Sequence, residues 1–315
     1  MEKERILTEA EYNLIEYLFG MTDKQLYKVM KNFLTSRYSE ERVFANENFI
    51  IACGESPIAI VAHLDTVFKY PVSDLYYDQT KNVLWSPDGL GADDRAGVFA
   101  IIKLTKITPR PSIILTMGEE VGGVGAATLA SIPCPFDNLK YMIELDRQGK
   151  DDAVFYSTGN KNFQNYITSF GFTKRKGTFS DISFLAPGWN KCAVNLSIGY
   201  EDEHSVIERL YVTHMFDTIH KVAKMLKETN IPDFEYIDDE QYYSMFKSID
   251  TEKDPNQCEC CGQKVLAYEM LPVKIGISKK AMYCVDCLSK VEWCAQCQEP
   301  FISATDSILC EECKR

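Results

Sequence analysis

The sequence predicts an α/β protein in which helices cover both faces of a mixed, mostly parallel sheet, followed by a small cysteine-rich zinc-binding module. Two observations lead to this expectation. Over residues 48–200, short apolar runs bounded by turn residues alternate with amphipathic stretches, which is typical of strands buried on both faces. Nine of the twelve cysteines lie in the last 58 of the 315 residues, and this crowding indicates metal rather than a disulfide framework.

The predicted elements follow one another along the first 230 residues. Residues 5–38 are expected to be helical, because apolar residues repeat there every three to four positions. The apolar runs that predict strands are 49–52, 58–62, 113–117, 141–145, 154–156 and 193–198. The amphipathic stretches that predict helices are 96–104, 125–132, 163–170 and 212–227.

Composition and charge exclude several classes of protein. Hydrophobic residues make up 45% of the chain and charged residues 25%, which is ordinary for a globular protein. No apolar run approaches the roughly 18 residues that span a bilayer. The opening residues lack the layout of an export signal, so we expect a cytoplasmic protein without membrane contact. The net charge of −12 argues against a nucleic-acid partner, because phosphate contacts need a basic surface.

The chain divides into three predicted regions. Residues 1–231 form the catalytic domain, residues 232–254 a linker, and residues 255–315 a zinc-ribbon-like module. Pro232 ends the preceding helix. The linker contains eight acidic residues, two lysines and several aromatic residues, and we expect its aromatic side chains to pack against a neighbouring surface.

Histidine and acidic side chains follow the predicted strands at the points where the strands end, and one further acid, Asp93, lies where a predicted helix begins. Ligands of doubly wound sheets collect at the carboxyl ends of the strands, so these side chains are expected to share one edge. They are His63, Asp65, Asp93, Glu119, Glu120, Asp146 and His204. Each motif alone has an ordinary explanation, such as a helix N-cap for Asp93. Their order and common placement predict a site that suits zinc.

Several segments together resemble a known family of enzymes. They are 61–67 (Val-Ala-His-Leu-Asp-Thr-Val), 91–97 (Gly-Ala-Asp-Asp-Arg-Ala-Gly), 116–122 (Thr-Met-Gly-Glu-Glu-Val-Gly), 144–147 (Glu-Leu-Asp-Arg) and His204. Over residues 45–225 the chain is similar to the co-catalytic di-zinc exopeptidases, which include bacterial zinc aminopeptidases, carboxypeptidase G and acetylornithine deacetylases. Ser180-Asp181 also matches the aminopeptidase branch, although Ile182 stands where that branch usually has histidine.

The resemblance implies two catalytic zinc ions bridged by Asp93. His63 and Asp146 would complete one site, and Glu120 and His204 the other. Zinc, cobalt and manganese all stay open as the metal. The chemistry agrees with this ligand set, because two cations held close together need a carboxylate between them and lower the pKa of a shared water.

Two further acids have roles that the resemblance implies. Glu119 would bind no metal and would act as general base toward the bridging water and then as proton donor to the leaving nitrogen. Asp65 would hold the His63 ring in its ligating tautomer. The peptide bond between Asp93 and Asp94 is expected to be cis. Arg147 could receive a substrate carboxylate or belong to a structural ion pair.

Spacing selects a branch of the family. Asp146 and His204 are 58 positions apart, and Asp65 and Asp93 are 28 apart, too few for the lid or the β domain that other branches insert. A compact aminopeptidase acting on a small peptide is therefore the leading prediction, with an N-acyl amino acid deacylase or a dipeptidase as the alternative. A third alternative is an inactive adaptor that recruits partners through its cysteine-rich tail.

The tail contains four Cys-x-x-Cys pairs, which predict two structural zinc ions, each bound by four cysteines. The pairs are Cys258/Cys261, Cys284/Cys287, Cys294/Cys297 and Cys310/Cys313. Sequential pairing is favoured because a ribbon-sized gap separates the last two pairs, and a cross-braced pairing stays open. Cys260 is left over. Acidic residues slightly outnumber basic ones in the tail, which favours a protein partner or self-association over nucleic acid.

Overall fold

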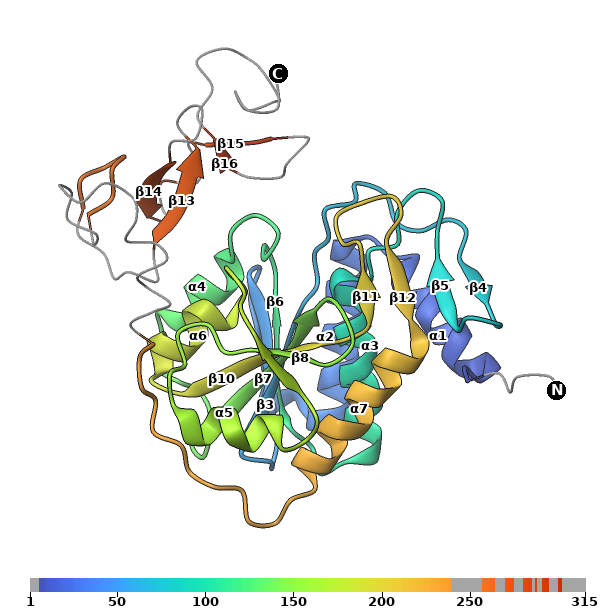
Figure 1. Ribbon diagram of the computed structural model, residues 1–315, viewed down its shortest axis with the longest axis horizontal. Helices are drawn as coiled ribbons and strands as arrows, with labels where there is room; N and C mark the ends of the chain where they lie inside the picture. The colour runs from blue at the N-terminus through green and yellow to red at the C-terminus, as the bar shows by residue number, and fades with distance from the viewer. Residues whose placement is uncertain are drawn as a thin grey trace. The chain divides into compact units, whose positions relative to one another are not determined.

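The computed structural model describes residues 6–239, 257–263, 270–274, 280–284, 287, 291–294 and 300–301. The chain separates into two compact units, Met1–Asp239 and Glu240–Arg315, each of which is described by itself (Figure 1). Among the described residues, no helix is both long and apolar enough to cross a bilayer.

A sheet of eight strands forms the centre of the first unit, in the order β1-β2-β6-β3-β7-β10-β8-β9. The strands are β1 (Val43–Ala45), β2 (Phe49–Ala52), β3 (Ile58–His63), β6 (Ser112–Thr116), β7 (Tyr141–Arg147), β8 (Asp152–Val154), β9 (Thr173–Arg175) and β10 (Cys192–Ser197). The four central strands β6, β3, β7 and β10 are parallel. β2 runs antiparallel to β1 and β6, whereas β8 runs antiparallel to β10 and parallel to β9. All residues of β2, β3, β6 and β10 are buried, and this explains their continuously apolar sequences.

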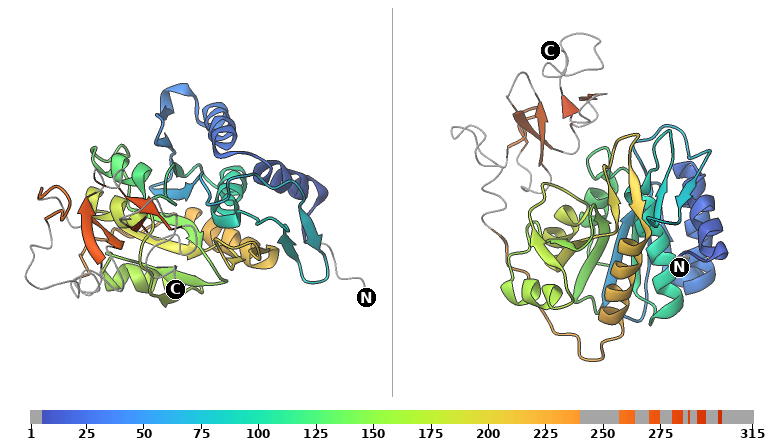
Figure 2. Two further views of the ribbon diagram at one scale, coloured as in Figure 1. Left: turned by 90° about the horizontal axis from the view of Figure 1, so that it is seen from above. Right: turned by 45° about the vertical axis from the view of Figure 1, so that its right-hand side comes forward.

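Helices cover both faces of this sheet, as predicted. They are α1 (Glu9–Phe19), α2 (Asp23–Tyr38), α3 (Ala92–Ile107), α4 (Val124–Ala130), α5 (Lys161–Thr168), α6 (Ile182–Trp189) and α7 (Val212–Leu226). Helices α4 and α6 pack against each other on one face, and the buried side chains of α1, α2, α3, α5 and α7 share one apolar core on the other (Figures 1 and 2). The mixed α/β architecture confirms the predicted fold class.

The predicted N-terminal helix is two helices. α1 ends at Gly20, and Thr22 begins α2 by accepting a hydrogen bond from the backbone of Gln25. The Gln25 side chain in turn accepts from the Thr22 backbone, so a capping box restarts the helix. The apolar periodicity continues through this break, which is why the pattern alone does not reveal it.

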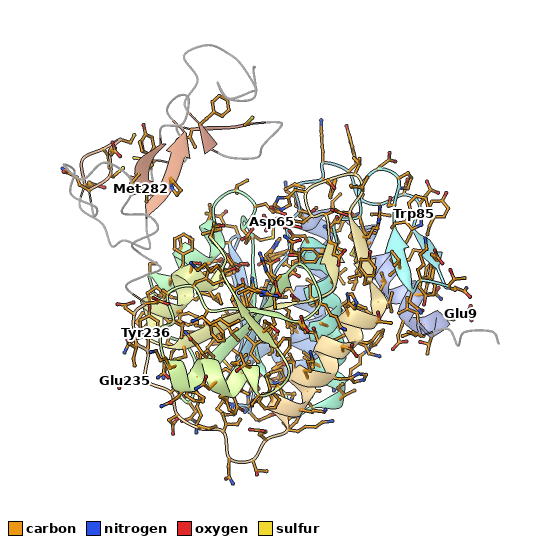
Figure 3. The ribbon with its side chains drawn as sticks, in the orientation of Figure 1. Glu9, Asp65, Trp85, Glu235, Tyr236 and Met282 are labelled. Atoms are coloured by element: carbon orange, nitrogen blue, oxygen red, sulfur yellow. The ribbon has the colours of Figure 1, made fainter. Side chains whose placement is uncertain are left out.

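A second, small sheet was not predicted. It has the order β11-β12-β5-β4, with β4 (Tyr76–Asp78), β5 (Val83–Trp85), β11 (Tyr200–Glu201) and β12 (Arg209–Tyr211). Strands of two or three residues are too short for a period of two to appear in a sequence. The Trp85 ring, labelled in Figure 3, is stacked on Tyr76 with the ring centroids 4.8 Å apart. The sheet positions the loop between β11 and β12, which contains His204.

The segment 232–239 packs against the first unit. The Gly159 amide donates to the carbonyl of Ile237 at 2.6 Å, and Asn160 Nδ2 donates to the carbonyl of Glu235 at 2.7 Å. The Phe234 ring lies 5.2 Å from the Phe163 ring, centroid to centroid. This part of the predicted linker is therefore part of the first compact unit, which extends to Asp239.

The second unit contains a four-stranded sheet in the order β14-β13-β16-β15. Its strands are β13 (Met270–Lys274), β14 (Lys280–Cys284), β15 (Glu292–Trp293) and β16 (Pro300–Phe301). Strands β13 and β14 are antiparallel and bring Cys284 back toward the start of the unit, near Cys258. Cys297, Cys310 and Cys313 lie outside the described residues.

Candidate metal centre

The predicted site residues of the first unit meet at one edge of the central sheet. His63 ends β3, and Asp65 follows it by two residues. Glu119 and Glu120 follow β6, and Asp146 lies near the end of β7. Because these strands are parallel, their carboxyl ends share an edge; Asp65 is labelled there in Figure 3. Asp93 comes from the first turn of α3, and His204 from the loop after β11.

Asp93 stands between the two histidines. Its Oδ1 lies 2.9 Å from His63 Nε2, and its Oδ2 lies 3.1 Å from His204 Nε2. Each carboxylate oxygen thus faces a different imidazole. The peptide bond that follows Asp93 is cis, as the family resemblance implies.

Each histidine faces a second carboxylate. His63 Nε2 lies 3.5 Å from Asp146 Oδ1, and His204 Nε2 lies 3.0 Å from Glu120 Oε2. The other oxygen of Glu120, Oε1, is buried and has no hydrogen-bond partner among the described residues. Two groups, each of one imidazole and one carboxylate with Asp93 shared, match the donors that zinc accepts, so the residues present fit a pair of cations.

Asp94 lies close to the same cluster, but its carboxylate is occupied by backbone groups. One oxygen accepts from the His63 amide at 3.2 Å, and the other accepts from the Gly97 amide at 3.0 Å. Its ligand atoms lie within 4.8 Å of those of His63 and Asp146. We therefore assign Asp94 to holding the start of α3 against β3.

The electrostatics of the cluster are those of a site that attracts cations. Although burial lowers the pKa of His204, the Asp93 and Glu120 carboxylates raise it to about 11. Burial and the negative charge of Asp93 raise the pKa of Asp146 to about 8. The acidic groups are crowded in a water-poor space, and positive charge between them stabilises their ionised forms.

Asp65 holds the loop of the two glutamates. Its Oδ1 accepts from the Gly118 amide at 2.8 Å, and its Oδ2 accepts from the Glu120 amide at 3.1 Å. His63 Nδ1 bonds instead to the backbone carbonyl of Asp65 at 3.0 Å, while the Asp65 carboxylate lies 3.6 Å away. The expected orientation of the ring is thus produced by the main chain of Asp65, because the carboxylate lies beyond normal hydrogen-bond distance.

Glu119 is partly buried beside the ligand cluster. Burial raises the pKa of its carboxyl well above the usual range, and the negative charges of Asp146 and Glu120 add to this effect. A carboxyl with a raised pKa is better matched to proton transfer near neutral pH than an ordinary glutamate.

Three residues of the site were missed in the sequence. Tyr200 Oη donates to Asp146 Oδ1 at 3.0 Å, and Asn195 Oδ1 accepts from the Asp146 amide at 3.0 Å. Glu208 accepts hydrogen bonds from the segment of Asp93. A polar Asn195 inside the otherwise apolar run of β10 was the only signal available in the sequence.

Two other residues singled out in the sequence have partners of their own. The Asp181 carboxylate is buried and accepts a hydrogen bond from the Thr116 hydroxyl. Arg147 Nε lies 3.9 Å from Asp152 Oδ2, a long ion pair at the end of β7, and has no hydrogen-bond partner among the described residues. Both interpretations of Arg147, a structural ion pair and a substrate-binding residue, therefore stay open.

In the second unit, four cysteines gather as a tetrahedral site requires. The sulfurs of Cys258, Cys261, Cys284 and Cys287 all lie within 4.8 Å of one another. The Cys284 amide donates to Cys258 Sγ at 3.2 Å. Although burial raises the pKa of the Cys258 thiol, backbone N–H groups lower it to about 6, which favours the thiolate that binds zinc. These are the first and second Cys-x-x-Cys pairs of the sequence.

Solved structures share this fold. Aminopeptidase PepT from Bacillus cereus has a TM-score of 0.52 at 16% identity, over 71% of this chain and 99% of the other. A tripeptidase from Staphylococcus aureus has a TM-score of 0.53 at 12% identity, over 71% and 99%. The TET aminopeptidase of a thaumarchaeon from marine sediment has a TM-score of 0.57 at 12% identity, over 71% and 98%.

Scans against protein-family models and against curated proteins give no match. The chain therefore shares its fold with solved aminopeptidase and tripeptidase structures, in agreement with the α/β fold that the sequence predicts.

Proposed function

We propose that the first unit, predicted as a catalytic domain over residues 1–231, is a metal-dependent hydrolase that cleaves the amide bond of a small peptide as an aminopeptidase does. Two zinc ions, or cobalt or manganese in their place, would be bound by His63, Asp146, Glu120 and His204, with Asp93 shared. The observation that carries the proposal is the placement of Asp93, whose two oxygens each face a different histidine.

Each residue of the site has its own role in the proposed hydrolysis. When bound, a pair of such cations polarises the scissile carbonyl and lowers the pKa of the attacking water. The Glu119 carboxylate is left unligated, accepts the proton of that water and passes it to the leaving nitrogen. Asp65 supports both events, because its carboxylate fixes the backbone from which Glu119 and Glu120 project.

The variant Glu119→Gln tests this assignment. Glutamine keeps the size of the side chain and removes its basicity, so zinc content should stay at the wild-type level while hydrolysis of amino-acyl substrates falls by about 10²–10⁴-fold. Glu16→Gln, at an exposed position on α1, is the control and should be fully active. Wild type and Glu119→Gln that are equally inert across amino-acyl, dipeptide and N-acetyl substrates would favour the inactive-adaptor alternative.

The same substrate panel separates the enzymatic alternatives. Cleavage of amino-acyl amides and tripeptides supports the aminopeptidase, whereas exclusive cleavage of N-acetyl amino acids or of dipeptides supports the deacylase or the dipeptidase. The compact spacing of the motifs leaves no lid domain between Asp146 and His204, which is why we place the aminopeptidase first.

For residues 255–315 we propose a zinc-ribbon module with two structural zinc ions, joined by the predicted linker 232–254. The described Cys258, Cys261, Cys284 and Cys287 support one site. We assign the second to Cys294, Cys297, Cys310 and Cys313 from their sequence spacing alone. A protein partner or a second copy of the chain is the proposed ligand of this module. Analytical ultracentrifugation of Cys284→Ser against wild type measures the contribution of the module to self-association.

Metal analysis tests the ion count. We expect four zinc ions per chain, and two in Asp93→Ala, since that change removes the ligand shared by both catalytic ions. A wild-type content of two that Asp93→Ala leaves unchanged would contradict the proposed catalytic pair.

A further inference from the structure

Glu208 is a fully buried carboxylate that belongs to neither predicted ligand group. It lies on the loop that leads from His204 into β12. Its Oε2 accepts a hydrogen bond from the Gly91 amide at 2.6 Å, and its Oε1 accepts one from the Asp93 amide at 3.0 Å. Glu208 therefore joins two segments that are more than a hundred positions apart in the sequence.

These hydrogen bonds replace the cap that α3 lacks. The residue before the helix, Gly91, has a left-handed backbone with φ of 63° and provides no side chain for capping. The first amides of a helix need acceptors, and buried amides without them cost free energy. Glu208 supplies the acceptors from a different segment of the chain. The backbone of Asp93 is thereby fixed directly to the loop that contains His204.

A buried carboxylate at the start of α3 is electrostatically unfavourable. Glu208 is completely buried close to Asp93, and two buried carboxylates repel each other. Serine or asparagine at the N-cap would satisfy amides without adding a charge. What the carboxylate does provide is reach, since it contacts both Gly91 and Asp93 from the loop of His204.

We propose that Glu208 is a positioning residue for the ion between Asp93, Glu120 and His204, holding Asp93 Oδ2 and His204 Nε2 in the geometry that this one ion needs. The inference rests on the proposed function. Both proposed ions share Asp93. The ion of His63 and Asp146 has its other two ligands on β3 and β7, whereas the second ion uses His204, which lies on the same loop as Glu208. Removal of Glu208 should therefore weaken the ion of His204 more than the other.

The test is a titration of the full-length, metal-free chain with Co²⁺, in wild type and in Glu208→Gln. Thiolate sites and imidazole–carboxylate sites give different visible spectra, so the steps belonging to the two units are separable, and chelator competition gives each Kd. We expect Glu208→Gln to raise the Kd of one imidazole–carboxylate step by about 10–100-fold, as loss of an outer hydrogen-bond partner commonly does. The other imidazole–carboxylate step should weaken less, and the thiolate steps should be unchanged.

Glu11→Gln is the matched control, because the Glu11 side chain also accepts a backbone amide at a helix start, that of Thr8 at 2.9 Å, outside the ligand cluster. It should leave every cobalt step unchanged. Glu208→Asp keeps the charge and shortens the reach, and we expect the same selective loss, which provides a second variant should Glu208→Gln not fold. Circular dichroism of the metal-free proteins checks folding.

Equal Kd values in wild type and both Glu208 variants would overturn the inference while leaving the proposed function intact. Equal weakening of both imidazole–carboxylate steps would also overturn it, since the effect would then be a general loss of structure. A wild-type chain that binds Co²⁺ through thiolates alone would contradict the proposed function itself.

Discussion

The Asp65 carboxylate fixes the backbone of the loop 118–120, which contains Glu119 and Glu120. It accepts the amides of Gly118, Glu119 and Glu120, the last of which it holds at 3.1 Å. These amides have no comparable acceptor if the charge is lost. The position of Glu119 relative to the proposed ligands thus depends on Asp65.

Asp65→Asn should therefore impair both metal binding and turnover. One oxygen remains to accept, and the new NH2 group opposes one of the loop amides. We expect zinc affinity to fall by about 10–100-fold, and kcat at saturating zinc to remain below wild type because Glu119 is displaced. Zinc competition and steady-state kinetics measure the two effects. Wild-type kcat at saturating zinc would contradict the role assigned to Asp65.

Tyr200→Phe should affect only the proposed ion that His63 and Asp146 bind. The Tyr200 hydroxyl donates to Asp146 Oδ1 at 3.0 Å, and its loss leaves a buried acceptor without that donor. Such a loss costs about 1–3 kcal/mol, so the ion shared by His63 and Asp146 should bind more weakly and the other ion normally. The Co²⁺ titration described above measures this. Tyr12→Phe, which removes a donor to the Leu75 carbonyl, is the control.

At this scale, the sequence predicts the residues that have a distinctive chemical type and misses those that support them. His63, Asp93 and Glu119 are recognisable because their order follows a family motif. Tyr200 and Glu208 are not, because a tyrosine or a glutamate near a strand is ordinary until the tertiary structure places it against a ligand. The sequence points to Asp65 as the partner of the His63 ring, but it does not show which group of Asp65 makes the contact. In the structure this group is the backbone carbonyl and not the carboxylate.

Helix α3 lies directly against β7, the strand that contains Asp146. A Cβ added at Gly97 would meet the Leu145 carbonyl oxygen at 2.4 Å and Asp94 Oδ1 at 2.4 Å. Glycine at this position is therefore required for the approach of α3 to β7. The segment Gly-Ala-Asp-Asp-Arg-Ala-Gly thus contains a glycine that close packing requires as well as the proposed ligand Asp93.

Gly97→Ala should destabilise the protein by about 1–3 kcal/mol, as overpacking does, and should also lower zinc affinity because the Asp94 carboxylate must move. Chemical denaturation and zinc competition measure the two quantities. Gly20→Ala is the control, since a Cβ there would come no closer than 3.1 Å to the Glu16 carbonyl oxygen. Stability of Gly97→Ala equal to that of the control would show that α3 can move away from β7 without cost.

The sequence predicts a strand when the strand is uniformly buried and at least about four residues long. The central strands β3, β6, β7 and β10 have five to seven residues each, and their apolar runs identify them. The small sheet with β5 and β12 escapes prediction because three residues show no period. The packing of segment 232–239 depends on Phe234 meeting Phe163, a contact between distant positions that no local pattern contains.

The whole molecule combines two kinds of candidate metal site in two compact units. The first unit offers imidazole and carboxylate donors that project from a sheet with a large apolar core. The second offers thiolates, and its described apolar cluster consists of six buried residues, three of them cysteines. The consequences of removing metal should differ accordingly, because a large core folds without a metal whereas a small one depends on it.

We expect a strong chelator to abolish hydrolysis while leaving the first unit folded and unfolding the second. Hydrogen exchange read peptide by peptide should show that β3 and β7 keep their protection in the metal-free chain, whereas β13 and β14 lose theirs. The variant Cys284→Ser is the control, because it removes one thiolate and should expose β13 and β14 even in zinc, with β3 and β7 unaffected. Loss of protection in β3 and β7 on chelation would mean that the ions hold the first unit together, and that the imidazole–carboxylate site is structural as well as catalytic.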